Sequence, residues 1–152
     1  MSSPATTSGA NGAVREVDGG TADAAEAVVA ALVSGDTDRY LAVCAPDVLL
    51  DLVVPMWRFQ LSGHDGLREA LAGEFLPGRR VNEQHVTPTS DGVLVELEAE
   101  GLEDGQPVKW WTMHHIRIDG DRVVEHIAHC SGMLDQQQMA RQAAEAPMVR
   151  AR

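Results

Sequence analysis

The stretch that decides the fold is Trp110-Trp111-Thr112-Met113-His114-His115-Ile116-Arg117-Ile118-Asp119-Gly120-Asp121-Arg122-Val123-Val124-Glu125-His126-Ile127-Ala128-His129-Cys130. Its alternation of apolar and polar residues predicts two long strands joined by a tight turn at Asp119-Gly120. Four of the six histidines lie on these strands, and the alternation divides them between the two faces of the sheet. The register of this hairpin therefore decides which histidines lie together.

Two registers fit the pattern. If an extra residue forms a bulge at the turn, even-numbered positions share a face, and His114 and His126 become cross-strand neighbours about 5–8 Å apart. A bulge-free two-residue turn pairs His114 with Glu125 instead, and periodicity alone leaves both registers open. We predict the bulged register, with Trp110 beside both histidines. Only this register makes a continuous inner face from four apolar residues: Ile116, Ile118, Val124 and Ala128.

The composition indicates one globular domain of 152 residues without an apolar run long enough to span a bilayer. The net charge of −11 argues against nucleic acid and anionic membranes as partners, because there is no basic stripe to bind phosphates. Residues 1–20 are rich in Ser, Thr, Gly and Ala and lack the features of a secretory signal, so we interpret them as a flexible tail. Cys44 and Cys130 suggest free thiols in a reducing cytoplasm.

The rest of the chain reads as helices followed by strands. Helical spacing predicts helices over residues 21–34, with Thr21 as N-cap, over 36–44 and from Ser62 to Phe75. A buried strand is expected over 48–54, and antiparallel strands over 81–87, 93–102, 108–118 and 122–130. Three glutamates alternate with apolar residues and predict a solvated face: Glu96, Glu98 and Glu100. This order predicts an α+β fold, with helices packed on one side of a curved sheet, and a C-terminal helix or tail over 136–152.

Four phrases carry a resemblance to a known superfamily: residues 31–36, 44–48, 61–71 and 116–125. In this order they resemble the nuclear transport factor 2-like superfamily, which includes ketosteroid isomerase, scytalone dehydratase, limonene epoxide hydrolase and the SnoaL-like polyketide cyclases. The resemblance covers about residues 22–135, and we take 21–135 as the domain. It implies a cone-shaped antiparallel sheet wrapped by three helices from the N-terminal half around an apolar pocket. Function varies within this fold, so the fold alone does not give the function.

The resemblance also shows that the catalytic residues of ketosteroid isomerase are missing from this sequence. The positions of the ketosteroid isomerase tyrosine, base and second oxyanion donor are taken by Val28, Leu52 and His114, so isomerisation by that mechanism is not expected. The resemblance places His126, Ala128 and Cys130 on pocket-lining positions. Gln84-His85 is similar to a Gln-His phrase of scytalone dehydratase, although Tyr40 is the only tyrosine.

His114 and His126 are the sharpest candidates for acid–base chemistry, because imidazoles titrate near neutral pH and can both take and donate a proton. The alternative is that both are buried histidines satisfied by structural hydrogen bonds. His85 joins them only in one register of its strand. Asp51, next to the family's base position, is a candidate for orienting a histidine, provided that a one-residue slip turns it into the pocket.

Six residues are candidates for substrate binding. Trp57 and Trp110 can stack a planar substrate or simply belong to the core, and Arg58 can bind a carboxylate or enolate or remain in solvent. The full candidate set is Trp57, Trp110, Arg58, Tyr40, Ala128 and Cys130.

Two further alternatives concern metals and partners. Three histidines can hold zinc, but their spacing here is not diagnostic, and we expect neither a metal nor a cofactor. The apolar residues Trp111, Met113 and Ile127 share a face with His129 and need cover. Because the outer sheet face commonly forms a dimer interface in this family, we expect a homodimer there.

The favoured hypothesis is a cytoplasmic, cofactor-independent enzyme that uses histidine acid–base chemistry on a hydrophobic small molecule. The reaction expected is a cyclisation, dehydration or isomerisation next to a carbonyl, in bacterial secondary metabolism. One alternative is a non-catalytic ligand-binding or assembly module of the same fold. Another is an epoxide hydrolase, although the Asp-Arg-Asp arrangement of such enzymes has no clear match among Glu96, Glu98 and the last strand.

Overall fold

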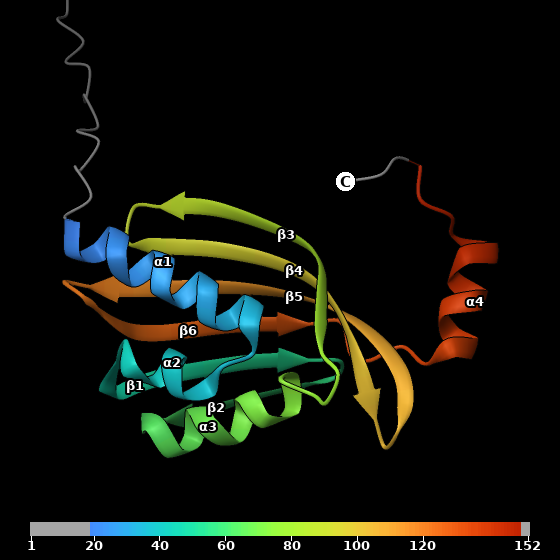
Figure 1. Ribbon diagram of the computed structural model, residues 1–152, viewed down its shortest axis with the longest axis horizontal. Helices are drawn as coiled ribbons and strands as arrows, with labels where there is room; N and C mark the ends of the chain where they lie inside the picture. Colours follow the sequence, from blue (N-terminus) through green and yellow to red (C-terminus); the bar gives the residue numbers. More distant parts are fainter. Residues whose placement is uncertain (1–18, 150–152) are drawn as a thin grey trace, which may run out of the picture.

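The computed structural model describes residues 19–149 and shows an α+β fold built on one curved, open six-stranded sheet (Figure 1). The strand order is β2-β1-β6-β5-β4-β3. The strands are β1 (Cys44–Val54), β2 (Trp57–Ser62), β3 (Arg80–Thr89), β4 (Gly92–Glu103), β5 (Gln106–Asp119) and β6 (Arg122–Cys130). The predicted fold class and the order of helices before the meander are confirmed.

Three helices cover one face of the sheet: α1 (Gly19–Ser34), α2 (Thr37–Ala42) and α3 (Gly63–Glu74) (Figure 1). Helix α1 buries Val28, Ala31 and Leu32 in the main core, where they meet apolar residues of the sheet's inner face. Thr21 does not cap this helix, because it lies inside α1 and its hydroxyl donates to the Gly120 carbonyl at 2.8 Å. The same face of the sheet therefore carries both the core and the histidines discussed below.

The sheet is mixed, which corrects the prediction of an antiparallel sheet. Strand β1 is longer than the expected segment 48–54 and pairs with β6 in parallel and with β2 in antiparallel fashion. Strand β2 was not predicted, and it follows β1 through the two-residue connection Pro55-Met56. The parallel pair forms between strands that are far apart in the sequence, so no local sequence pattern predicts it.

The last hairpin has the predicted even-numbered register. Asp119 pairs with Arg122, so the central turn residues are Gly120 and Asp121 and not the expected Asp119-Gly120. A register shift between Arg117 and Ile118 then brings Ile116 opposite His126 and His114 opposite Ala128. The bulge therefore lies within β6 beyond the turn.

One residue of the inner face differs from the sequence prediction because of this bulge. Val123 is fully buried, whereas Val124, which we expected to face inward, is only partly buried. The extra residue shifts the alternation of β6 by one position between Val123 and Glu125.

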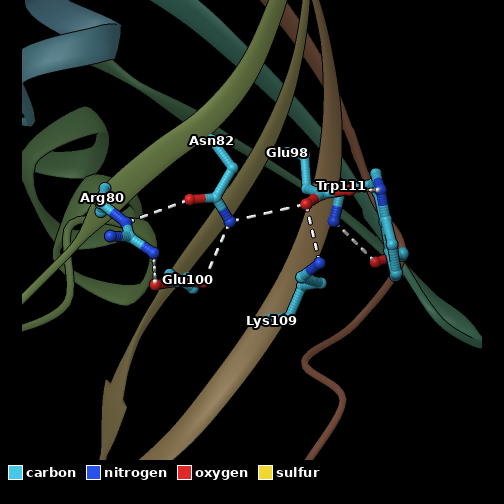
Figure 2. Close-up of polar contacts among 7 residues, drawn as sticks. Arg80, Asn82, Glu98, Glu100, Lys109 and Trp111 are labelled. Carbon is cyan, nitrogen blue, oxygen red and sulfur yellow. Dashed lines mark hydrogen bonds and ion pairs between the residues drawn. The ribbon is translucent and has the colours of Figure 1, made fainter. Parts of the chain in front are cut away.

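The outer face of β3, β4 and β5 carries a polar network (Figure 2). Glu98 accepts the Trp111 indole N–H at 3.0 Å and pairs with Lys109 at 2.8 Å. Glu100 accepts a hydrogen bond from Asn82 at 3.0 Å. The intervening residues Val95, Leu97 and Ala99 are buried on the other side, as the alternation predicted.

Helix α4 (Gln136–Glu145) follows the sheet and begins with a capping box formed by Asp135 and Gln138. It supplies the C-terminal helix expected within residues 136–152. The tail expected over residues 1–20 lies outside the described residues, apart from Gly19 and Gly20, which belong to α1. Within residues 19–149, no helix combines the length and apolar character needed to cross a membrane.

Candidate active site

A chain of buried hydrogen bonds runs across the inner face of the sheet. His114 Nδ1 lies 2.8 Å from His126 Nε2, and His126 Nδ1 lies 2.8 Å from the Tyr40 hydroxyl. The two histidines come from neighbouring strands β5 and β6, and Tyr40 comes from α2 above them. All three side chains are essentially inaccessible to solvent. The register of the last hairpin thus brings His114 and His126 together, and the packing of α2 on the sheet adds Tyr40; all three were candidates predicted from the sequence.

Beyond His114, this series of side-chain contacts continues to two further residues. His114 Nε2 lies 2.8 Å from the Thr112 hydroxyl and 3.3 Å from Glu74 Oε1. Glu74 is the last residue of α3, and its Oε1 also lies 3.7 Å from Arg79 Nη2. Thr112, Glu74 and Arg79 were not among the candidates predicted from the sequence.

A signal for Glu74 was present in the sequence. Leu67 and Leu71 mark the buried face of α3, and Glu74 follows Leu71 by three residues on that same face. An acid on the apolar face of an amphipathic helix is unusual, because a buried carboxylate needs a partner. Thr112 carried a weaker signal, as its position two residues before His114 puts it on the same face of the strand.

The protonation states follow from burial and contacts. Burial, reinforced by the neighbouring His114, lowers the pKa of His126 to about 3. Burial raises the pKa of the Tyr40 phenol well above its ordinary value. Burial also acts to raise the pKa of Glu74, but His114 and the charge of Arg79 outweigh it, so this pKa lies below its ordinary value. At neutral pH the site therefore holds a carboxylate, a neutral His126 and a neutral phenol.

These states give the hydrogen bonds a direction. Because a carboxylate only accepts, His114 Nε2–H points toward Glu74 and Thr112. When His114 is neutral, its bare Nδ1 accepts from His126 Nε2–H, and the bare Nδ1 of His126 accepts from the Tyr40 O–H. Every donor then points from α2 toward Glu74.

Glu74 and Thr112 form part of the wall of an apolar pocket of about 370 Å³. Trp110, Ala128 and Cys130, all candidates from the sequence, line the same pocket. The other lining residues come from β1, β2, α3 and the segment after β6: Leu52, Val54, Phe59, Leu61, Glu69, Ala70, Gly73, Gly132 and Met133. His114 and His126 are not among them, and lie one layer deeper than we expected. The volume and apolar character are typical of small-molecule sites.

Trp110 contributes an indole N–H without a partner. The side chain is fully buried, and its Nε1 has no hydrogen-bond partner in the described part of the chain. Trp57, the other candidate for stacking a planar substrate, is 70% exposed at the start of β2 and does not line the pocket. A planar ligand therefore has one tryptophan available, not two.

Asp51 and Arg58 lie on the opposite face of the sheet. Leu50 and Leu52 point inward, so Asp51 points outward, where it pairs with Arg58 through Oδ1 at 2.8 Å and accepts from Gln60 at 3.0 Å. Hydrogen bonds from Arg58 and Gln60 lower the pKa of Asp51 to about 2. The structure thus brings Asp51 and Arg58 together, but away from the buried histidines.

His85 also lies on the outer face. It is opposite Glu96 and contacts Glu83 Oε1 at 2.9 Å, whereas its neighbour Gln84 faces α1. A register shift between Val81 and Glu83 sets this orientation. The three histidines considered for zinc are therefore not assembled. Within residues 19–149, no group of three or more His, Cys, Asp or Glu side chains is arranged to hold a metal ion.

Comparisons with known proteins agree on the family and the fold. A family model described as a SnoaL-like domain matches residues 25–126. No curated protein matches the sequence at a significant level. The expected resemblance to the SnoaL-like proteins is confirmed by the family model, and the solved structures share the expected nuclear transport factor 2-like fold.

Three of the similar solved structures illustrate the range of the fold. A nuclear transport factor 2-like protein from Anabaena variabilis is 20% identical, with a TM-score of 0.59 over 78% of this chain and 96% of that chain. A putative polyketide cyclase from Xanthomonas campestris is 18% identical, with a TM-score of 0.58 over 81% and 96%. The epoxide hydrolase/cyclase-like enzyme SalBIII, described as having a role in pyran ring formation in the polyether salinomycin, is 12% identical, with a TM-score of 0.59 over 73% and 90%. At these identities the likeness concerns the fold alone.

Proposed function

Because the chain belongs to the SnoaL-like domain family, we propose that it is a small-molecule enzyme that moves a proton on a neutral, apolar substrate. The substrate occupies the pocket formed by Trp110, Ala128 and Cys130, and Glu74 is the group that exchanges the proton with it. His114 contacts Glu74, His126 is hydrogen-bonded to His114, and both assist Glu74 without lining the pocket themselves. The reaction is a cyclisation, dehydration or isomerisation next to a carbonyl, and bacterial secondary metabolism is the setting we favour.

One observation carries this proposal. The hydrogen-bonded chain Tyr40–His126–His114 ends 3.3 Å from the Glu74 carboxylate on the wall of an apolar pocket, and within residues 19–149 the buried Glu74 Oε1 has no hydrogen-bond partner. Buried polar atoms without a partner are rare, and perturbed titratable groups in a pocket are more frequent at functional sites than elsewhere. A purely structural core would be built more simply from apolar side chains.

The proposed chemistry begins with a substrate C–H bond next to a carbonyl. The Glu74 carboxylate takes the proton, and the electron pair of the broken bond moves to the carbonyl oxygen, which becomes an enolate. The hydrogen-bonded residues His114, His126 and Tyr40 keep a donor directed at Glu74 and hold the Glu74 carboxylate in position. The Thr112 hydroxyl, which accepts from His114, retains its own proton to donate to the enolate oxygen. Return of the proton from Glu74 to another carbon completes an isomerisation. In a dehydration the enolate electron pair reforms the carbonyl and a carbon–carbon double bond, the bond to the β-hydroxyl group breaks, and that group takes the proton from Glu74 and leaves as water.

The localisation proposed from the sequence remains the cytoplasm. Cys44 and Cys130 are both free thiols, which supports a reducing compartment. Epoxide opening is a weaker alternative, because the Asp51–Arg58 pair lies on the face away from the pocket and Arg79, the partner of Glu74, does not line the pocket.

Deuterium exchange into 2-tetralone tests the proposal without knowledge of the natural substrate. This flat, apolar ketone has acidic C–H bonds next to its carbonyl, and exchange in D₂O is followed by proton NMR. We expect the wild-type protein to accelerate the exchange and Glu74→Gln to lower the rate by about 10²-fold or more, the usual contribution of a positioned base. The control Glu103→Gln removes an exposed carboxylate of β4 and should retain the wild-type rate.

Two outcomes contradict the proposal. If Glu74→Gln exchanges the ketone as fast as wild type, Glu74 is not the base. If the ketone binds, as seen by quenching of tryptophan fluorescence, but the wild-type protein does not accelerate exchange, the ligand-binding alternative replaces the enzyme.

A further inference from the structure

Arg79 is buried beside the candidate site although arginine is seldom buried. Its side chain is only 5% exposed. Nη1 donates to the Val33 carbonyl of α1 at 2.9 Å, and the guanidinium lies over the Phe75 ring at 4.9 Å from its centroid. Val33 and Phe75 thereby fix the side chain from two sides.

The rest of the guanidinium has one electrostatic partner. Nε and Nη2 are shielded from solvent and have no hydrogen-bond partner in residues 19–149, but Nη2 lies 3.7 Å from Glu74 Oε1. A buried guanidinium charge is costly unless an opposite charge compensates it. Glu74 supplies that charge, so the two groups depend on one another.

Several titratable groups surround Glu74. His114 from β5, His126 and Cys130 from β6, and Tyr40 from α2 all interact with its charge, and Glu69 of α3 lines the same pocket. His126, Cys130 and Tyr40 are neutral near pH 7, because burial disfavours their charged forms. Arg79 also interacts with Glu74: burial lowers the pKa of its guanidinium and the charge of Glu74 opposes this, and an arginine remains cationic at ordinary pH.

We propose that Arg79 is a positioning residue whose buried guanidinium keeps the Glu74 carboxylate ionised inside the apolar site. Without Arg79, His114 alone of these two neighbours opposes the effect of burial on Glu74, so the balance moves toward the protonated carboxyl, which cannot accept a proton from a substrate. The consequence for activity rests on the function proposed above, whereas the charge state of Glu74 is a property of the protein alone.

Carboxyl-carbon NMR of the full chain labelled with ¹³C-glutamate tests the inference directly. The spectrum of Glu74→Gln identifies the Glu74 resonance by its absence. In wild type we expect Glu74 to titrate below the ordinary range of glutamate. In Arg79→Gln, which retains a donor for the Val33 carbonyl but loses the charge, we expect the midpoint to rise by about one pH unit or more.

Two further variants serve as rescue and control. Arg79→Lys restores a cation and should reverse most of the rise. Arg80→Gln removes the next arginine in the sequence, which is exposed and pairs with Glu100 at the surface, and should leave the midpoint unchanged. In the exchange assay, the acidic limb of the rate profile of Arg79→Gln should move upward by the same amount as the NMR midpoint.

Two results would overturn the inference: a wild-type Glu74 midpoint above the ordinary range, or an unchanged midpoint in a folded Arg79→Gln protein. The wild-type and Arg79→Lys titrations decide the matter even if Arg79→Gln does not fold. A failure of the proposed function looks different, because Glu74→Gln would then exchange the ketone normally while the Arg79-dependent NMR shift persisted.

Discussion

At the scale of single residues, the site depends on keeping one histidine uncharged. His126 is buried between Tyr40 and His114, and within residues 19–149 no carboxylate forms an ion pair with its ring. His114 differs because its Nε2 reaches Glu74 at 3.3 Å. Two histidines on adjacent strands therefore have different electrostatic surroundings, which the sequence alone does not distinguish.

His126 should make the stability of the protein depend on pH. Its pKa falls from 6.5 in the unfolded chain to about 3 in the folded protein, so its contribution is complete above pH 6.5 and is lost as pH falls toward 3. Within this window the unfolded chain binds the extra proton, and the free energy of unfolding should fall by about 1.4 kcal/mol per pH unit from this group. Urea unfolding at several pH values between 4 and 7 measures the slope.

The His126→Gln variant should show a shallower slope over this range, whatever its stability at pH 7. His129→Gln, on the same strand but exposed, is the matched control and should keep the wild-type slope. Equal slopes in wild type and His126→Gln would mean that His126 is not held neutral by the fold.

The residues of the site differ in how far the sequence predicts them. The alternation of the last two strands predicts that His114, His126 and Trp110 share a face, and the structure agrees. Glu74 reaches His114 only because α3 packs over the sheet, a tertiary contact that strand periodicity does not contain. The placement of Asp51, Arg58 and His85 on the outer face depends on register, which a shift of one residue reverses.

At the scale of elements, β2 and its turn were the main omission. Trp57, Phe59 and Leu61 alternate with polar residues, so the local pattern was compatible with a strand. Pro55 occupies the turn between the two strands, where its fixed φ is suitable. The parallel pairing of β1 with β6 depends on the path of the whole chain and was not accessible from either segment.

The β1–β2 turn contains a strained residue. Met56 has a φ of 64°, a left-handed conformation that glycine adopts without cost, and its side chain is fully exposed and packs on nothing. Met56→Gly should therefore raise the free energy of unfolding by about 0.5–1 kcal/mol, because relief of strain exceeds the added flexibility of the unfolded chain. Urea denaturation measures the change.

Met56→Ala provides the control for this turn, since alanine keeps the Cβ that causes the strain. It should be no more stable than wild type. If the glycine and alanine variants have the same unfolding midpoint, the backbone conformation of Met56 is not a source of strain.

At the scale of the whole molecule, the two faces of the sheet have different roles. The inner face carries the core, the pocket and the buried hydrogen-bonded chain beneath α1, α2 and α3. The outer face carries the charged network of Figure 2 together with the partly exposed apolar residues Trp111, Met113 and Ile127. This face is hollowed between Trp111 and Met113 and the side chains of Glu83, His85 and His129.

This outer face is where we propose that two copies of the chain associate. Met113 is 43% exposed beside Trp111 and His129, and apolar surface of this kind favours burial against a partner. Each copy carries a net charge of −11, so long-range repulsion opposes association and salt should screen it. We therefore expect a homodimer whose dissociation constant decreases as sodium chloride is raised from 50 to 300 mM, as measured by sedimentation velocity at micromolar concentration.

Met113→Glu should make the protein monomeric at both salt concentrations, because it places a charge in the apolar contact. Val86→Glu, which adds the same charge at a position also 43% exposed but beside α1 on the inner side, should remain dimeric. A wild-type monomer at 300 mM salt, or a dimer unaffected by Met113→Glu, would exclude this face as the interface.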